Sequence, residues 1–214
     1  MKGKFIVIEG IDGSGKTTQI NQVAKWLKGS NLIPEKNQLV ITREPGGTKL
    51  GHSIRSLLLN TSKETAPYSI TELLLYAADR AQHVNEIIRP AITKGDWVIS
   101  DRFTGSTLAY QGYGRKLDIK LIKHLETIAT DGIAPDLTFL LDISVEESIQ
   151  RRINRKEDRM EEEGRDFLSN VSLGFKALCA NKKWKKISAM KSEEEIISEI
   201  KLEIKKLLNN EKNG

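Results

Sequence analysis

The segment Gly10-Ile11-Asp12-Gly13-Ser14-Gly15-Lys16-Thr17 fits the phosphate-binding pattern G-x-x-x-x-G-K-S/T at every fixed position. It follows the apolar run Phe5–Ile8 and precedes a helix-like segment, so it stands in the strand–loop–helix context that such a loop requires. Glycines let successive backbone N–H groups turn inward towards a phosphate, and the helix adds its positive N-terminal end. A glycine-rich turn that binds nothing is the alternative, and the context disfavours it. We therefore expect the chain to bind a nucleoside triphosphate.

The same motif assigns individual roles. Lys16 is expected to reach the outer phosphates, and the Thr17 hydroxyl is expected to hold Mg²⁺. The nucleotide-binding set is predicted to be Gly10, Ile11, Asp12, Gly13, Ser14, Gly15, Lys16, Thr17 and Thr18.

Composition limits the remaining possibilities. The 214 residues suit a single domain, and 38% hydrophobic with 29% charged residues is ordinary for a globular protein. No apolar run approaches a membrane span and no signal-peptide pattern is present, which favours a cytoplasmic protein without membrane association. The single Cys179 excludes an internal disulfide and a cysteine-cluster metal site. The net charge of +5 raises nucleic-acid binding, but recognition-helix and zinc-finger patterns are missing, so no nucleic-acid partner is expected.

Short apolar runs alternate with longer helical patterns, which is typical of a parallel α/β sheet. Strands are expected at Phe5–Glu9, Leu39–Thr42, Trp97–Ser100, Leu137–Ile143 and Lys186–Ser188. Helices are expected near Thr17–Lys28, Gly51–Leu59, Thr71–Lys94, Ile119–Ala129, Val145–Asn154, Asp166–Asn181 and Glu193–Leu208. Pro90 lies inside one of these helices and is expected to kink it. The prediction is a three-layer fold of the P-loop NTPase type, with a five-stranded parallel sheet flanked by helices.

Residues 151–165 stand apart because they are dense in charge and almost free of apolar side chains. Such a segment is expected to be a mobile surface excursion that closes as a lid. Its arginines, delivered over a moving phosphoryl group, would stabilise the negative charge. The alternative is a solvated helix face. The predicted catalytic residues are Lys16, Arg102, Arg152, Arg155 and Arg159.

Polar side chains also follow two further strands. Asp101 and Arg102 come directly after a buried strand, where Asp101 could organise Mg²⁺ and Arg102 could clamp an anionic acceptor. A surface ion pair is the alternative. The run Ser106–Gly112 adds hydroxyl, amide and ring groups suited to a small heterocycle. Arg43, which opens the sequence Arg-Glu-Pro-Gly-Gly-Thr, could contact an acceptor together with Arg55; a turn with structural glycines is as compatible.

Tyr76 and Arg80 are spaced i, i+4 on an expected helix, so they share one face. A ring and a guanidinium on one face could stack on a base and hydrogen-bond to it. A core aromatic beside a snorkelling arginine is equally compatible with the pattern.

Together these motifs resemble the thymidylate kinase family of the bacterial kind over nearly the whole chain. The resemblance is carried by FIVIEGIDGSGKTT at 5–18, REPGGT at 43–48, LLLYAADRAQH at 73–83, the DRF…STLAYQGYGR segment at 101–115, and the arginine-rich lid. It implies phosphorylation of dTMP to dTDP, for dTTP synthesis, by in-line transfer from ATP with Mg²⁺. It also implies a homodimer, with the helix around 73–75 as a candidate contact.

The resemblance implies a role for each matching position. Asp12 would bind the 3′-hydroxyl of the acceptor, Tyr110 would disfavour ribose, and Arg102 with Asp101 would serve the acceptor phosphate and the magnesium site. Tyr76, where Phe is usual, would stack on thymine, while Arg80, Thr107 and Gln111 would read the base. The predicted acceptor set is Asp12, Arg43, Glu44, Arg55, Tyr76, Arg80, Arg102, Thr107, Tyr110 and Gln111, with Glu9 and Glu44 as more loosely placed acidic neighbours; the metal set is Thr17 and Asp101.

Departures from the family pattern are informative. Gly13 stands where some members, notably eukaryotic ones, carry an arginine, so the lid is expected to supply that positive charge. The lid also looks slightly shorter than in some bacterial relatives, which leaves open which of its arginines reaches the phosphates. Ser188 and Ala189 occupy a region where an acidic residue is common, and 187–190 is the candidate adenine site.

Three alternatives remain open at this point. Another nucleotide or nucleoside kinase of the same fold would take a different acceptor. A GTP-dependent switch should show N-K-x-D, but Asn181-Lys182-Lys183-Trp184 lacks the Asp. A nucleotide-binding scaffold would bind without turnover.

Overall fold

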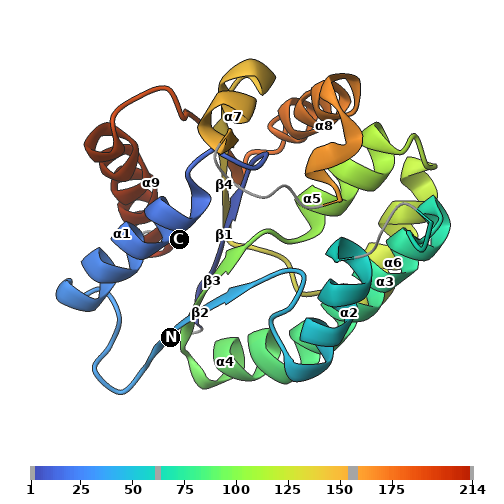
Figure 1. Ribbon diagram of the computed structural model, residues 1–214. Helices are drawn as coiled ribbons and strands as arrows, with labels where there is room; N and C mark the ends of the chain where they lie inside the picture. Colours follow the sequence, from blue (N-terminus) through green and yellow to red (C-terminus); the bar gives the residue numbers. More distant parts are fainter. Residues whose placement is uncertain (1–2, 61–63, 154–158, 213–214) are drawn as a thin grey trace.

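A five-stranded parallel sheet forms the centre of the computed structural model, which describes residues 3–60, 64–153 and 159–212 (Figure 1). The strands lie in the order β2-β3-β1-β4-β5. Their bounds are β1 Phe5–Glu9, β2 Leu39–Arg43, β3 Trp97–Asp101, β4 Leu137–Asp142 and β5 Trp184–Ser188. All five predicted strands are present, which confirms the predicted fold class.

The central strand β1 is buried on both faces of the sheet, whereas the edge strands β2 and β5 are partly exposed. Phe5 pairs with Val98 of β3, and Ile6 pairs with Leu137 of β4. All five residues of β1 are buried, which explains its continuous apolar run. Alternate residues of β1 belong to two separate clusters of the core, one on each face of the sheet.

Helices cover both faces of the sheet (Figure 1). On one face lie α1 Lys16–Gly29 and α9 Glu193–Lys212, which pack together. The other face carries α2 Lys49–Leu59, α3 Ser69–His83, α4 Arg89–Lys94, α5 Thr104–Thr107, α6 Ile119–Thr130 and α8 Arg165–Leu178. No helix in the described ranges is long and apolar enough to cross a bilayer.

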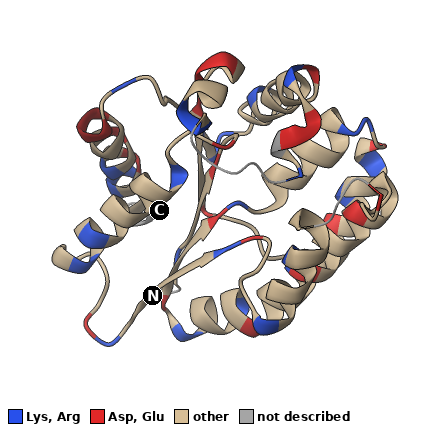
Figure 2. Cartoon of the chain, viewed as in Figure 1, with Lys and Arg blue, Asp and Glu red and all other residues tan. Residues whose placement is uncertain are grey.

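The short helix α7 (Val145–Arg152) lies above the carboxyl ends of the central strands. Ser144 caps it, and its first turn is acidic while its last turn holds Arg151 and Arg152. Figure 2 shows this reversal of charge from one end of α7 to the other. The arrangement matches the helix dipole and brings two arginines towards the phosphate-binding loop.

The predicted helix 71–94 changes type along its length. A π-helical turn, η1 (Val84–Ile88), joins α3 to α4, and Pro90 lies at the start of α4. Proline has no N–H to donate to the preceding turn, and the wider π-helical turn accommodates this missing donor. A second π-helical segment, η2 (Leu108–Gly114), was not predicted, and it carries Tyr110 and Gln111.

The segment 151–165 was expected to be a mobile surface excursion, but some of its side chains are buried. Arg152, Arg159 and Met160 are all buried, and a short 3₁₀ helix, η3 (Glu161–Glu163), follows them. The buried arginines of this segment hydrogen-bond to buried groups elsewhere in the chain, and composition alone could not predict these partners. Residues 154–158, including Arg155, lie outside the described residues.

Candidate active site

The phosphate-binding loop is a tight turn between β1 and α1 in which side chains are excluded at two positions. Gly10 has φ 148°, and a Cβ there would lie 2.7 Å from the carbonyl oxygen of Leu141. Gly13 has φ 81°, and a Cβ there would lie 2.8 Å from the carbonyl oxygen of Ser148. The Ser148 hydroxyl donates to the Asp12 carbonyl at 2.6 Å. Helix α7 is therefore fastened directly to the loop.

Lys16 lies over this loop and is buried. Its Nζ donates to the carbonyl oxygens of Gly10 (3.1 Å) and Ile11 (3.3 Å) and to Asp12 Oδ1 (3.3 Å). The N–H groups of the first turn of α1 have no partners within the helix, as at any helix N-terminus. An ammonium group and free N–H groups at one point form an anion-binding site.

Arg102 connects the loop to the rest of the site. Its backbone is left-handed, with φ 72°, which is uncommon for a residue with a β-carbon and marks a constrained position. Its guanidinium donates to the Gly10 carbonyl (2.9 Å) and to Asp12 Oδ1 (2.8 Å), and it lies 5.2 Å from the Tyr110 ring centre. Burial would raise the pKa of Asp12, but the charges of Arg102 and Lys16 lower it well below its usual range.

Asp101 and Thr17 form a site suited to a divalent cation. Asp101 is the last residue of β3 and pairs in register with Arg43, the last residue of β2. Both Asp101 and Thr17 line the same cavity. Within residues 3–60, 64–153 and 159–212, Asp101 Oδ1 is buried without a hydrogen-bond partner. A carboxylate oxygen and a hydroxyl oxygen are both of the kind that Mg²⁺ prefers, so these two residues could hold the ion.

One cavity of about 610 Å³ runs from the phosphate-binding loop across the carboxyl end of the sheet, a size suited to small ligands. It brings together most of the predicted site: Asp12, Gly13, Ser14, Gly15, Lys16, Thr17, Thr18, Arg43, Glu44, Arg55, Tyr76, Arg80, Asp101, Arg102, Thr107, Tyr110 and Gln111. Among the described lid arginines, Arg151 lines it, whereas Arg152 and Arg159 do not.

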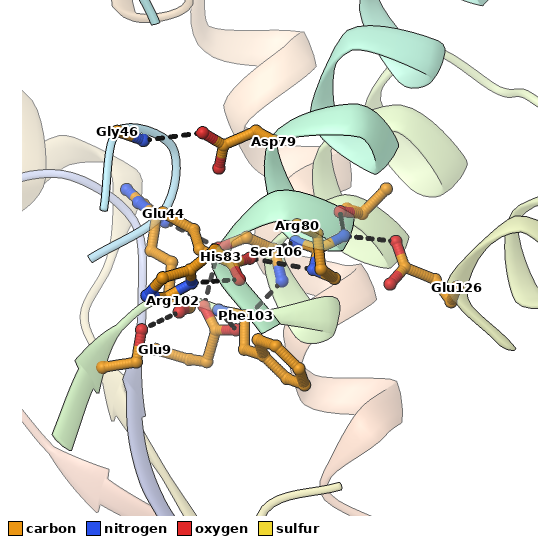
Figure 3. Close-up of polar contacts among 12 residues, drawn as sticks. Glu9, Glu44, Gly46, Asp79, Arg80, His83, Arg102, Phe103, Ser106 and Glu126 are labelled. Carbon is orange, nitrogen blue, oxygen red and sulfur yellow. Dashed lines mark hydrogen bonds and ion pairs between the residues drawn. The ribbon is translucent and has the colours of Figure 1, made fainter. Parts of the chain in front are cut away.

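Arg80 is fixed by buried acceptors on several elements (Figure 3). Its Nε donates to Glu44 at 2.8 Å, and its Nη1 donates to Thr107 Oγ1 at 2.8 Å and to Glu126 at 2.5 Å. Its Cζ lies 5.3 Å from the ring centre of Phe103. Arg80 is therefore a buried group held in one orientation, which rules out the alternative of a snorkelling arginine. Its second carboxylate partner, Glu126, was not predicted.

Glu44 is equally constrained. Its Oε1 lies 2.8 Å from His83 Nδ1, and His83 Nε2 lies 2.7 Å from Thr42 Oγ1. Nearby, Asp79 accepts from the Gly46 N–H at 3.0 Å, and burial together with Glu44 raises the pKa of Asp79 to about 6 (Figure 3). Glu44 was expected to be a loosely placed neighbour, but its carboxylate holds Arg80 and His83.

Glu72 on α3 is another buried carboxylate that was not predicted. It accepts from Gln111 Nε2 at 2.8 Å, from Arg115 at 3.1 and 3.3 Å, and from Arg159 at 2.5 Å. Arg159 Nε also donates to the Leu58 carbonyl at 2.8 Å. The structure therefore shows Arg159 as a buried clamp at the end of the lid, away from the phosphate-binding loop. Charged residues recur on the otherwise apolar face of α3, and this pattern in the sequence could have indicated that the helix buries ion pairs.

Arg151 and Arg152, at the end of α7, lie near the phosphate-binding loop. Arg152 Nε donates to the Ser148 carbonyl at 3.3 Å, and its Cγ would meet a β-carbon at position 13 at 3.4 Å. The space beside Gly13 is thus already occupied by a lid arginine. Arg151 donates to the Ala189 carbonyl at 3.0 Å. Ala189 also lines the cavity. Around it, the wall of the cavity is completed by Lys191, Ser192, Glu193 and Ile196.

Glu9, the last residue of β1, fixes the backbone next to Arg102. It is fully buried, and it accepts from the backbone N–H of Phe103 (2.9 Å) and Ser106 (3.1 Å) and from the Ser106 hydroxyl (2.6 Å). Figure 3 shows how this carboxylate holds the start of α5 beside Arg102. Burial raises the pKa of Glu9 to about 7, although the charge of Arg102 opposes the shift.

Comparison with known proteins agrees with this geometry. The family model for thymidylate kinase matches residues 8–200. The thymidylate kinase of Prochlorococcus marinus (strain NATL2A) is 78% identical over 210 residues, 98% of this chain and 100% of that one. That of Synechococcus sp. (strain CC9605) is 59% identical over 192 residues, 90% and 92% of the two chains. The crystal structure of thymidylate kinase from Ehrlichia chaffeensis matches with a TM-score of 0.75 and 35% identity, covering 98% and 100%. The chain belongs to the thymidylate kinase family, whose members phosphorylate dTMP with ATP as the phosphoryl donor.

Proposed function

We propose that the chain, as one nucleoside-monophosphate-kinase-like domain with a lid at 151–165, transfers the phosphoryl group in line, with each substrate at its own end of the cavity. The triphosphate of ATP lies on the loop 10–17 under Lys16, and dTMP lies against Tyr76, Arg80 and Gln111. The observation that carries this proposal is the continuity of the cavity from the loop to that wall. No side-chain base is needed because the acceptor is already a phosphate oxygen, so positioning and charge neutralisation provide the catalysis.

Individual residues then divide the work at the reacting phosphates. Arg102 binds the acceptor phosphate, and Asp12 binds the sugar 3′-hydroxyl, with Tyr110 against C2′. Arg43 and Arg55 add positive charge at the acceptor end. Arg151, which lines the cavity, and Arg152, which packs beside Gly13, are the described lid arginines that would support the transition state. Arg155 remains a prediction for the same role.

Thr17 and Asp101 would hold Mg²⁺, which when bound neutralises charge on the donor phosphates. The unpartnered Oδ1 of Asp101 supports this assignment. The test is Asp101→Asn, assayed over a range of Mg²⁺ concentrations with dTMP and ATP fixed. The Mg²⁺ concentration for half-maximal activity should rise at least about tenfold. An unchanged requirement would remove Asp101 from the metal site.

An acceptor panel tests the whole assignment. dTMP, dUMP, AMP, GMP, CMP and thymidine are compared with ATP as donor, and ADP release is measured. dTMP should give the highest kcat/KM. A clear preference for any other acceptor would contradict the proposed acceptor site.

We also infer a cytoplasmic homodimer. Exposed apolar side chains gather on three neighbouring helices, α2, α3 and α6, and they include Leu57, Leu74 and Ile128. A second copy of the chain would cover this face. Sedimentation velocity should give a dimer for the wild type and a monomer for Leu74→Glu. A wild-type monomer at micromolar concentration would contradict the inference.

A further inference from the structure

Glu72 is buried behind the base-reading wall of the cavity. Its side chain has no exposed surface, and it reaches Gln111 on η2 across the interface between α3 and η2. Its Oε1 accepts from Gln111 Nε2 at 2.8 Å. Arg115 and Arg159 donate to the same carboxylate, and Arg115 is itself stacked 4.9 Å from the ring centre of Phe167. The carboxylate therefore has one fixed position.

This contact decides which way the Gln111 amide faces. A glutamine amide has a donor end and an acceptor end of nearly the same shape, so either could point into a site. A carboxylate can only accept, so the NH₂ group of Gln111 must face Glu72. The amide carbonyl, Oε1, is left on the other side of the same planar group. Gln111 also lines the cavity.

The polarity of that amide distinguishes pyrimidines. N3 of thymine carries a hydrogen, whereas N3 of cytosine carries a lone pair. A fixed acceptor can bond to the N3–H of thymine, but it faces the lone pair of cytosine without a hydrogen between them. A mismatched, buried polar pair of this kind costs about tenfold or more in affinity.

We propose that Glu72 is a positioning residue that sets the specificity of the enzyme, by holding Gln111 as an acceptor towards N3–H pyrimidines and against cytosine. The proposal rests on the proposed function, in which Gln111 faces the acceptor base. Uracil shares the N3–H of thymine and differs only in its methyl group. Glu72 therefore governs the choice between dTMP and dCMP and has no part in the choice between dTMP and dUMP.

The test is Glu72→Gln, with kcat/KM measured for dTMP, dCMP and dUMP. An amide at position 72 can accept as well as donate, so Gln111 becomes free to flip and to donate to cytosine N3. The dTMP/dCMP ratio should fall at least about tenfold, and the dTMP/dUMP ratio should stay within about twofold. The control is Glu163→Gln, which removes another carboxylate partner of Arg115 without touching Gln111. It should leave both ratios unchanged.

A double-mutant cycle with Gln111→Met separates positioning from a general structural effect. If Glu72 acts through Gln111, Glu72→Gln should no longer change the dTMP/dCMP ratio in the Gln111→Met background. A ratio that falls equally in both backgrounds, or a dTMP/dUMP ratio that falls in parallel, overturns the proposal. If Gln111→Met alone leaves the dTMP/dCMP ratio unchanged, the placement of Gln111 in the acceptor site is wrong, which is a failure of the proposed function.

Removing Glu72 leaves the buried Arg159 and the half-buried Arg115 with fewer acceptors, so the single variant has a stability risk. The variant carrying Glu72→Gln and Arg159→Gln removes one cation together with the carboxylate. Compared with Arg159→Gln alone, it should show the same fall in the dTMP/dCMP ratio. No fall in that comparison overturns the proposal as well.

Discussion

The two ends of the cavity, which we propose bind the phosphoryl donor and the acceptor, are built from different groups. The donor end consists of consecutive backbone groups from 10 to 17, the N-terminus of α1 and a single ammonium, Lys16. The acceptor end consists of side chains from five elements, held by buried charges such as Glu44, Glu72 and Glu126. A phosphate requires only N–H groups and positive charge, whereas a base requires oriented donors and acceptors.

This contrast predicts where mutations act. A change at the donor end removes charge stabilisation of the transferring group and should act mainly on kcat. A change at the acceptor end frees a base-binding side chain to adopt other orientations, so it should act mainly on the KM for dTMP. The following variants test that division, from the largest expected effect to the smallest.

Lys16→Ala removes the ammonium that lies over the phosphate-binding loop and that we propose contacts the triphosphate. We expect kcat to fall about 10³-fold, about 4 kcal/mol of transition-state stabilisation, with the fold intact. Lys25→Ala, an exposed position on the same helix, is the matched control and should retain wild-type kcat. Steady-state kinetics and circular dichroism measure both. Normal turnover by Lys16→Ala would exclude the loop as the donor site.

Glu9 is buried in the central strand β1, and we expect its ionisation to change the free energy of unfolding. Because burial raises the pKa of Glu9 from 4.5 to about 7, the folded state binds more protons than the unfolded state between these values. Stability contributed by the protonated group is complete below pH 4.5 and is lost as pH rises through 7, by about 3 kcal/mol.

Glu9→Gln should lack this dependence. Chemical denaturation at pH 5 and pH 8 would show the wild type losing about 3 kcal/mol relative to the variant. Asp79 titrates in both proteins, so its contribution cancels in the difference. Parallel pH profiles for the two proteins would contradict the raised pKa.

Glu44→Gln removes the charge that holds Arg80 and His83 at the acceptor end. The KM for dTMP should rise about tenfold to thirtyfold, about 1.4 to 2 kcal/mol, while the KM for ATP stays within about twofold. Glu86→Gln, an exposed carboxylate one helical segment further on, is the control. An equal rise in both KM values would break the division between the two ends.

Gly13→Ala tests the junction of the loop with α7. The left-handed backbone alone costs about 1 to 2 kcal/mol of stability, and the contact with the Ser148 carbonyl adds to it. Gly132→Ala is a matched control, because Gly132 has φ 78° but nothing within 4 Å of a β-carbon. Only the first variant should also lower kcat. If the two substitutions had the same effect on stability and on kcat, the close contact between Gly13 and α7 would not matter for activity.

The same contrast explains how far the sequence was informative. The loop, Asp101 and Arg102 could be predicted because their geometry depends on neighbours within a few residues and on the end of a strand. The partners of Arg80 and Gln111 could not, because Glu44, Glu72 and Glu126 lie 36 to 46 residues away along the chain.

The lid shows the same limit. Arg159 was predicted to be a catalytic arginine of the lid, but it bonds to the buried carboxylate of Glu72, which is 87 residues away along the chain, and no local pattern connects the two residues. The π-helical segment that carries Tyr110 and Gln111 also has no simple periodic signature. Local chemistry is therefore visible in the sequence, while orientation through distant buried charges is visible only in the folded chain.

The left-handed backbone of Arg102 sets strain against bonding at a single residue. A β-carbon in that conformation costs about 1 to 2 kcal/mol, and glycine would relieve it. Glycine would also remove the guanidinium that bonds to Gly10 and Asp12, and the loss of these bonds outweighs the relief of strain. Laboratory evolution of this enzyme for thermostability should therefore retain arginine at this position even without an activity screen.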